Sequence, residues 1–151
     1  LLTTEDYEIN ARIRKAGGRI WLDPSIRSIY FARPTLLELA RQYWRYGYWK
    51  WRMLRRYPNT LRWRQALPPL FVLSLIGLIF LSLFITVARI TLLVELVLYF
   101  SIMIVAGLSA AFRQKKIYLS FGLALTIPVM HITWGGGFLW SMLTLIKQKH
   151  G

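Results

Sequence analysis

The hydrophobic pattern divides this chain of 151 residues into a mixed first part and a strongly apolar second part. From residue 66 onward, apolar residues run almost unbroken in three long stretches, at 66–88, 90–112 and 117–146. An α-helix needs about 20 apolar residues to cross a bilayer, so the pattern predicts membrane spans. We therefore expect an α-helical membrane protein with two to three transmembrane helices.

The third stretch, 117–146, is longer than one straight crossing requires. Pro128 and the run of three glycines at 135–137 predict a break near 128–137, which would give either a kinked helix or a pair of half-spans. A simple third crossing would place Lys147 and Lys149 on the outer side, whereas a re-entrant segment would not. Both topologies stay open.

Polar residues inside the spans predict contacts between helices. Glu95 is costly to bury as an ion, and Arg89, which lies between the first two stretches, is a partner within reach. For the lone His131, a hydrogen bond to a neighbouring helix is the simplest role. The glycine run at 135–137 favours close backbone packing or a break.

Shorter patterns predict the elements before residue 66. Residues 3–16 read as a helix that Thr3 or Thr4 caps, with Ile9, Ile13 and Ala16 as its buried stripe. Gly17-Gly18 would end that helix. Residues 19–22 and 25–31 are rich in β-branched and aromatic side chains and predict two short strands.

The stretch 35–65 predicts a basic, aromatic helix followed by a linker. Thr35 as N-cap and Glu38 three positions later form a capping box, and Pro58 ends the helix. Trp and Tyr alternate with Arg and Lys along it. That composition is typical of a helix lying in the head-group layer of a membrane.

Charge is concentrated in the same region. Residues 1–65 hold 14 Lys or Arg and five Asp or Glu, and 41–65 alone hold eight basic residues and no acid. Such a block attracts the phosphates of lipids, nucleotides or nucleic acid. The positive-inside rule then places 1–65 and the 113–116 loop in the cytoplasm. Because the chain has no cysteine, disulfides and thiolate metal sites are excluded.

Two polar signatures carry the candidate chemistry. Glu5-Asp6 opens the first helix, and Gln42-Tyr43-Trp44-Arg45-Tyr46 begins 36 positions after Asp6. Followed by membrane spans, they suggest an enzyme that acts on a substrate held at the membrane surface. Each has a simpler interpretation: the acid pair as a helix cap, Arg45 as a solvated charge and Trp44 as a head-group anchor.

With these motifs in this order, the chain resembles a membrane-bound family 2 glycosyltransferase of the kind that builds bacterial exopolysaccharides such as succinoglycan. The resemblance also covers Gly17, Pro24 and the segment His131 to Phe138. It implies a GT-A fold, of which 1–34 would be the carboxyl-terminal, acceptor-side part, and 66–151 the membrane region. We expect the chain to be the carboxyl-terminal piece of a longer protein. The donor-binding half, with an Asp-x-Asp site for Mg²⁺ or Mn²⁺, would precede Leu1, so the piece alone would be inactive and hold no cofactor or metal.

The resemblance also implies roles for individual residues. Asp6, beside Glu5, would be the general base that takes the proton of the acceptor hydroxyl in an inverting transfer. Gln42 and Arg45 match a Gln-x-x-Arg motif that lies near the donor diphosphate and the acceptor sugar. Tyr46 stands where processive synthases carry Trp, which favours addition of a single sugar, and Trp44 is a further candidate for stacking on the acceptor.

The implied partners are a nucleotide-sugar donor, a lipid-linked (polyprenyl) or saccharide acceptor, and anionic membrane lipids. The expected location is the inner cell membrane, multi-pass, with the catalytic part in the cytoplasm. An alternative function is a non-enzymatic multi-pass membrane protein whose polybasic arm binds lipid. A nucleic-acid-binding arm has only the charge in its favour, because no recognisable nucleic-acid motif is present, and no nucleic acid is expected as a partner.

Overall fold

The computed structural model describes residues 5–149, and every regular element in that range is a helix. The elements are α1 (Glu5–Lys15), α2 (Leu36–Arg56), the short 3₁₀ helix η1 (Pro58–Thr60), α3 (Trp63–Ser82), α4 (Thr86–Gln114) and α5 (Tyr118–Lys149). By length and composition, α3, α4 and α5 can each cross a membrane. The protein is thus an α-helical membrane protein, as the hydrophobic pattern predicts.

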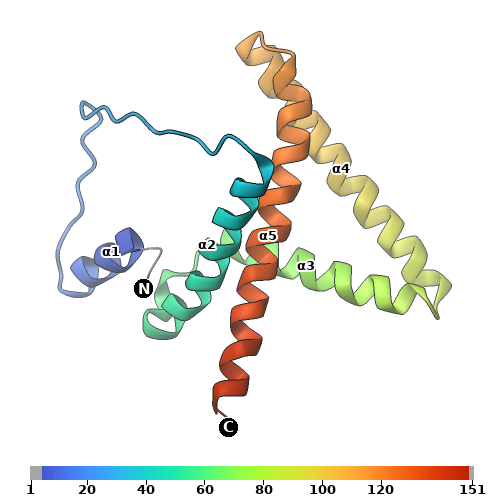
Figure 1. Cartoon of the computed structure of the whole chain (residues 1–151), viewed down its shortest axis with the longest axis horizontal. Helices are drawn as coiled ribbons and strands as arrows, with labels where there is room; N and C mark the ends of the chain where they lie inside the picture. The colour runs from blue at the N-terminus through green and yellow to red at the C-terminus, as the bar shows by residue number, and fades with distance from the viewer. Residues whose placement is uncertain (1–4, 150–151) are drawn as a thin grey trace.

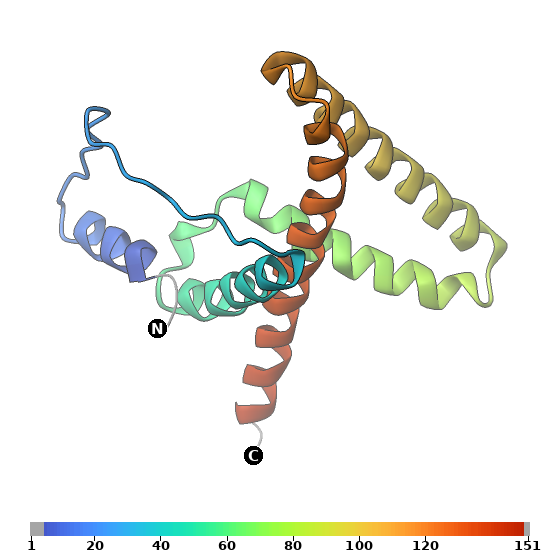
Figure 2. The same cartoon turned by 45° about the horizontal axis from the view of Figure 1, so that its top comes forward.

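The helices are arranged around α5, the longest of them (Figure 1). α3 and α4 form a hairpin that returns to α5, so that α3, α4 and the first half of α5 enclose an open triangle. α2 lies against the second half of α5, while α1 and the segment that joins it to α2 lie to one side (Figure 2). The membrane helices and α2 therefore meet on one common helix.

Glycines bring the backbones of α2 and α5 into contact. A Cβ at Gly47 of α2 would overlap the Trp134 carbonyl of α5, and a Cβ at Gly137 of α5 would overlap the Trp44 carbonyl of α2. Beside this contact, the rings of Trp51 and Phe138 meet edge to face with centroids 5.3 Å apart. Close approach of this kind is how small residues join helices in membranes.

The spans are joined by polar pairs. The Ser74 hydroxyl of α3 donates to Glu95 Oε1 of α4 at 2.5 Å, so Ser74 takes the place of the expected partner Arg89. Tyr99 Oη of α4 lies 3.0 Å from His131 Nδ1 of α5, which confirms the predicted bond between helices. Each pair places polar groups between helices, where they are shielded from lipid.

The turn between the first two spans lies earlier than the charge pattern places it. The chain turns at 83–85, and Arg89 falls in the first part of α4, where its Nε donates to the Ser82 carbonyl at 2.6 Å. The residues of the turn are Leu, Phe and Ile, so hydropathy continues through it. Arg89 satisfies a free carbonyl at the end of α3 rather than marking the loop.

α5 is one continuous helix through Pro128 and the glycine run, so the pair of half-spans that the sequence allowed near 128–137 does not form, while a kink there stays a prediction. The glycines serve as contact points: Gly135 faces the Pro68 carbonyl of α3, and Gly137 faces α2. Helices packed on several sides tolerate Pro and Gly because neighbours stabilise the backbone. Whether this helix crosses or re-enters the membrane stays a prediction.

The strands predicted at 19–22 and 25–31 do not form within the described residues, which are extended and exposed there. Trp21 is 88% exposed and Ile29 is 86% exposed. A strand requires a partner for its backbone N–H and C=O groups, and residues 5–149 provide none. The expected remnant of an α/β domain therefore does not appear as a sheet.

The structure can be compared with the helix ends that the sequence predicts. The Thr35 hydroxyl accepts a hydrogen bond from the Glu38 N–H at 3.2 Å, which confirms Thr35 as the N-cap of α2. α1 ends at Lys15, two positions before Gly17, whose φ of 80° suits glycine. The predicted caps Thr3 and Thr4 lie outside the described residues. Of the α1 side chains, Ala11 is buried while Ile9 of the expected stripe is 52% exposed.

Candidate functional site

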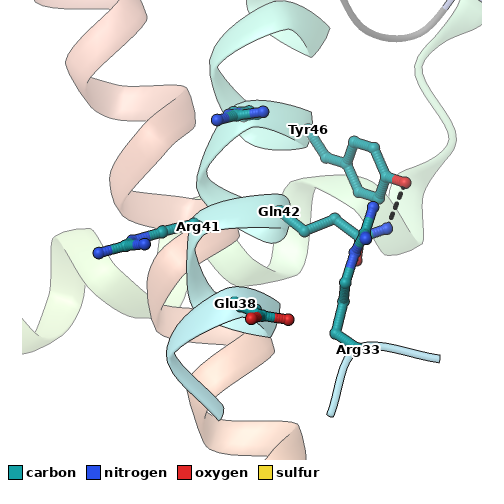
Figure 3. A pocket seen from close by; sticks show the side chains of 6 residues that line it. Arg33, Glu38, Arg41, Gln42 and Tyr46 are labelled. Carbon is teal, nitrogen blue, oxygen red and sulfur yellow. Dashed lines mark hydrogen bonds between the residues drawn. The ribbon is translucent and has the colours of Figure 1, made fainter. Parts of the chain in front are cut away.

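A pocket of about 300 Å³ lies on the first turns of α2 and the segment before it (Figure 3). It is lined by three arginines, one carboxylate, one amide and one phenol, namely Arg33, Arg41, Arg45, Glu38, Gln42 and Tyr46. We call it the Gln42 pocket, because Gln42 is hydrogen-bonded to two of its other members, Arg33 and Tyr46. Three of the six residues belong to the Gln-Tyr-Trp-Arg-Tyr motif.

Gln42 organises the pocket through three hydrogen bonds. Its Nε2 donates to Tyr46 Oη at 2.6 Å and to Tyr30 Oη at 3.3 Å. Its Oε1 accepts from Arg33 Nε at 3.2 Å. Figure 3 shows the bond to Tyr46 and Arg33 reaching toward both side chains. A single amide thereby holds one Arg and two Tyr side chains that come from different parts of the chain.

Helix geometry explains which residues meet. Gln42 and Tyr46 are four positions apart, so they are neighbours on one face of α2. Arg41 and Arg45 are related in the same way on the adjoining face. Arg33 lies before the helix, and the Thr35 cap fixes the direction in which the chain enters α2 near Arg33. Figure 3 also shows Arg41 pointing away from Arg33, so the positive charge is spread around the pocket.

The pocket combines groups that suit a phosphorylated sugar. Guanidinium groups stay charged and bind phosphate oxygens in pairs, and Tyr rings pack on sugar faces. The rings of Tyr43 and Tyr46 meet edge to face at 5.7 Å. Burial raises the pKa of the Tyr43 hydroxyl, and the neighbouring Tyr46, Tyr30 and Tyr7 raise that pKa further. Tyr7 belongs to α1, and its ring centre lies 5.2 Å from Lys50 Nζ of α2, so α1 contacts α2 there.

The structure brings some predicted site residues together and not others. Gln42, Arg45 and Tyr46 line the pocket. The Trp44 ring lies against Gly136 of α5, which makes Trp44 part of the contact between the helices. Glu5 and Asp6 are exposed on α1 and do not line the Gln42 pocket. A shared pocket for Asp6 and Gln42 is not formed in this structure, and the catalytic role of Asp6 stays a prediction.

Sequence reasoning missed Tyr30, Arg33, Glu38 and Arg41. For Glu38 and Arg41 a signal was present, because they lie one turn before Gln42 and Arg45 on the same helix. Tyr30 and Arg33 lie nine or more positions before Gln42, outside the helix. Only the path of the chain brings them near, so no pattern in the sequence could identify them.

Within residues 5–149, no three His, Asp or Glu side chains come together in a way that could hold a metal ion. Glu38 is the carboxylate that lines the Gln42 pocket, and the other ionisable groups there are arginines. These residues do not fit a metal site. No step through a metal is therefore assigned to the described chain.

Comparison with known proteins shows a distant likeness to a curated protein. The chain is 27% identical over 145 residues, 96% of its length, to the succinoglycan biosynthesis protein ExoA of Rhizobium meliloti (strain 1021). The matched stretch covers 42% of that protein, so the chain spans less than half the length of this relative. No family model and no solved structure matches the chain.

Proposed function

We propose that the chain is the acceptor-side and membrane-anchoring part of a glycosyltransferase that takes part in exopolysaccharide synthesis. The observation that carries the proposal is the Gln42 pocket, where one amide holds Arg33, Tyr30 and Tyr46 beside Arg41 and Arg45. The likeness to a succinoglycan biosynthesis protein over nearly the whole chain supports it. So does the direct packing of α2 on the membrane helix α5.

In this proposal the substrates are a nucleotide-sugar donor and a sugar acceptor carried on a polyprenyl phosphate. The arginines of the Gln42 pocket bind phosphate oxygens, and Tyr46 packs on a sugar ring. The acceptor hydroxyl attacks the anomeric carbon, whose bond to the diphosphate oxygen breaks with inversion. Asp6 takes the proton of that hydroxyl. Because Asp6 lies on α1 outside the pocket, and α1 contacts the later turns of α2, α1 has to shift toward the first turns of α2 during the reaction.

The proposed location is the inner membrane, with α1, α2 and the 115–117 turn on the cytoplasmic side. The basic residues of 41–65 and the Arg113, Lys115 and Lys116 cluster support this orientation through the positive-inside rule. The donor-binding part and its Mg²⁺ or Mn²⁺ would lie in sequence other than the described residues. Nucleotide-sugars are soluble in the cytoplasm, so this orientation places the Gln42 pocket on the side of the donor.

The test is sugar transfer by the full-length enzyme in membranes, with three variants compared at matched expression. We expect Gln42→Leu to reduce transfer by about 10²-fold or more, because the bonds to Arg33 and Tyr46 are lost. Asp6→Asn should remove the base and reduce transfer by about 10²–10⁴-fold. Glu38→Gln keeps the backbone cap of Thr35 and should change transfer little.

The outcomes separate the components of the proposal. If Asp6→Asn transfers sugar normally while Glu38→Gln does not, the base is Glu38 and the role of Asp6 is lost. If Gln42→Leu and Asp6→Asn both transfer sugar normally, the enzymatic proposal fails. In that case the chain is a lipid-binding anchor, and neither substitution should change its affinity for anionic lipid.

A further inference from the structure

A second cavity, of about 700 Å³, lies where α1, the end of α2, η1 and the first turn of α3 meet. Arg14 of α1, Arg56 of α2 and Arg62 before α3 contribute to its walls. None of the residues that line the Gln42 pocket lines this cavity. We call it the basic cavity. Its volume is within the range of small-molecule sites, so it exceeds the needs of a lone ion.

The walls of the basic cavity carry positive charge without a balancing acid. Of its described lining residues, four are cationic and none is acidic; the cations are Arg14, Lys15, Arg56 and Arg62. Glu8 lies nearby, with its Oε1 3.8 Å from Arg56 Nη1, a long ion pair that neutralises one of the four only in part. Like charges gathered around one hollow repel each other unless an anion is present.

Neutral hydrogen-bond donors complete the lining. Asn10, Asn59 and Gln65 add amide groups. Gln65 Oε1 accepts from the Arg62 N–H at 3.3 Å, and this leaves its amide nitrogen as a donor. A hollow with several cations and amide donors fits an acceptor-only group with several oxygens. Phosphate and diphosphate groups have this character.

A buried lysine lies behind the cavity. Lys50 of α2 is only 3% exposed, its Nζ donates to the Thr60 carbonyl at 3.3 Å and lies 5.2 Å from the centre of the Tyr7 ring. Tyr7 and Thr60 both line the cavity. Burial lowers the pKa of Lys50, and the charge of Arg62 lowers it further. Lys50 is thus repelled by the positive charge of the cavity wall. An anion in the cavity would relieve this repulsion as well.

The cavity lies at the start of a membrane helix. Arg62 directly precedes Trp63, the first residue of α3, and Gln65 lies two positions after Trp63. The Trp63 side chain is 72% exposed and carries the Arg64 guanidinium over its ring, 5.9 Å from the centroid. An exposed Trp paired with Arg at the end of a span is typical of the head-group layer. The basic cavity therefore lies next to a Trp-Arg pair of the kind found in that layer.

We propose that the basic cavity binds a phosphate or diphosphate group at the membrane surface, with Arg14 and Arg62 as principal ligands. The group comes either from the head of a membrane lipid or from a soluble phosphate ester. Such binding needs no sugar transfer. It goes beyond the proposed function, because it assigns a ligand to residues that the Gln42 pocket does not contain.

The experiment uses the chain in phosphatidylcholine nanodiscs. One arm titrates inorganic pyrophosphate by calorimetry, and the other counts bound phosphatidate by native mass spectrometry in nanodiscs doped with that lipid. The double variant Arg14→Gln/Arg62→Gln is compared with Arg113→Gln/Lys116→Gln, which removes the same charge near the turn between α4 and α5. We expect saturable binding in the parent and the control, and weakening of about tenfold or more in the first variant.

The two arms identify the source of the group. Binding of both probes shows that the cavity recognises the phosphate itself, and binding of phosphatidate alone shows that the lipid delivers it; either result supports the proposal. Equal weakening in both double variants would mean that only overall charge matters, and the proposal would be overturned. Absence of saturable binding in both arms would overturn it as well.

Two controls keep the outcome readable. If the double variant does not fold, Arg14→Gln alone is used, because Arg14 is exposed on α1 and its side chain makes no hydrogen bond within residues 5–149. Sugar transfer by the full-length enzyme is measured separately with Gln42→Leu. Loss of transfer with intact pyrophosphate binding is the result expected where both proposals hold. Normal transfer with intact binding counts against the proposed function alone, and loss of transfer without saturable binding of either probe overturns this inference alone.

Discussion

The region where α2 packs on α5 and the amino-terminal arm, residues 5–34, differ sharply in how their side chains are held. In the α2–α5 region, glycines bring the backbones together and Met53 is 1% exposed. In the arm, large apolar side chains such as Trp21, Ile29 and Phe31 are 85–88% exposed. Both regions carry a motif of the proposed enzyme. Only the motif on α2 has its side chains fixed by several neighbours.

This difference shows what places a functional side chain. Gln42 lies on a helix whose far face is buried against α5, so its hydrogen bonds to Arg33 and Tyr46 have a fixed base. Asp6 lies on a helix that meets α2 through a long ion pair, Glu8 to Arg56, and the ring of Tyr7 beside Lys50. Such contacts contribute little stability. The position of Asp6 is thus less firmly fixed than that of Gln42.

Hydrogen exchange should give the largest contrast between the two regions. In 19–34 two backbone N–H groups donate hydrogen bonds within the described residues, that of Ile26 to the Asp23 carbonyl at 3.3 Å and that of Ser25 to Asp23 Oδ1 at 2.9 Å. We expect amides of 19–34 to exchange close to the unfolded rate, and amides in the middle of α2 to exchange about 10³-fold more slowly or beyond. Mass spectrometry of peptides from the protein in nanodiscs measures both.

The same measurement sharpens the comparison when made on the full-length protein. Protection that appears in 19–34 only there means that another part of the protein covers the arm and pairs its backbone. Slow exchange of 19–34 in the chain alone would contradict the exposure of this segment. The contrast between the arm and the α2–α5 region would then disappear.

A matched pair of glycine substitutions on α5 tests the backbone contact between α2 and α5. A Cβ at Gly137 meets the Trp44 backbone, whereas a Cβ at Gly122 has no atom of the described chain within 4 Å. We expect Gly137→Ala to lower the free energy of unfolding by about 1–3 kcal/mol, since α2 and α5 must separate. Gly122→Ala should raise that free energy by about 0.5–1 kcal/mol, because Ala is the better helix former. Thermal unfolding in detergent, followed by Trp fluorescence, measures both.

The opposite signs make this pair decisive. Equal effects of the two substitutions would show that α2 and α5 are not in backbone contact, and the fixed position of the Gln42 pocket would lose its cause. A large loss at Gly122 would instead indicate that another surface packs there.

Sequence predicts the parts of this fold that depend on local or one-dimensional signals. Three apolar stretches predict three spanning helices, and Thr35 with Pro58 predicts both ends of α2 to within a residue. The turn at 83–85 could not be predicted in the same way, because its Leu-Phe-Ile sequence is as apolar as the helices it joins. Strands at 19–22 and 25–31 depend on partners that residues 5–149 do not supply.

The Gln42 pocket shows the same division. Gln42, Arg45 and Tyr46 are recognisable as a motif, and their helical spacing puts them on neighbouring faces. Arg33 and Tyr30 join them only because the chain bends before Thr35. Lys50 would be counted among the solvated cations of 41–65, yet it is buried, because it falls on the face of α2 that carries Gly47 and Met53. Burial of that kind depends on tertiary packing.

Lys50 of α2 also contacts the arm, through the Tyr7 ring. The titration of Lys50 gives the smallest predicted effect on stability. Burial, and then the charge of Arg62, lower the pKa of Lys50 below its ordinary value of 10.5, so the folded state loses this proton before the unfolded state does. In that window the unfolded state binds more protons, and the free energy of unfolding therefore rises with pH. The gain begins as pH passes the lowered pKa and is complete above 10.5. Lys50→Met should lack this rise.

The measurement is the difference in free energy of unfolding between the parent and Lys50→Met, followed from neutral pH to about 11. Groups that lie far from Lys50 contribute equally to both proteins, so their contributions cancel in the difference. A flat difference would mean that Lys50 reaches water, and that the Tyr7 ring and the arm do not cover it. If pyrophosphate occupies the basic cavity, its negative charge should raise the pKa of Lys50 and shift the rise to higher pH. The same curve thus reports whether the arm covers Lys50 and whether an anion is bound in the basic cavity.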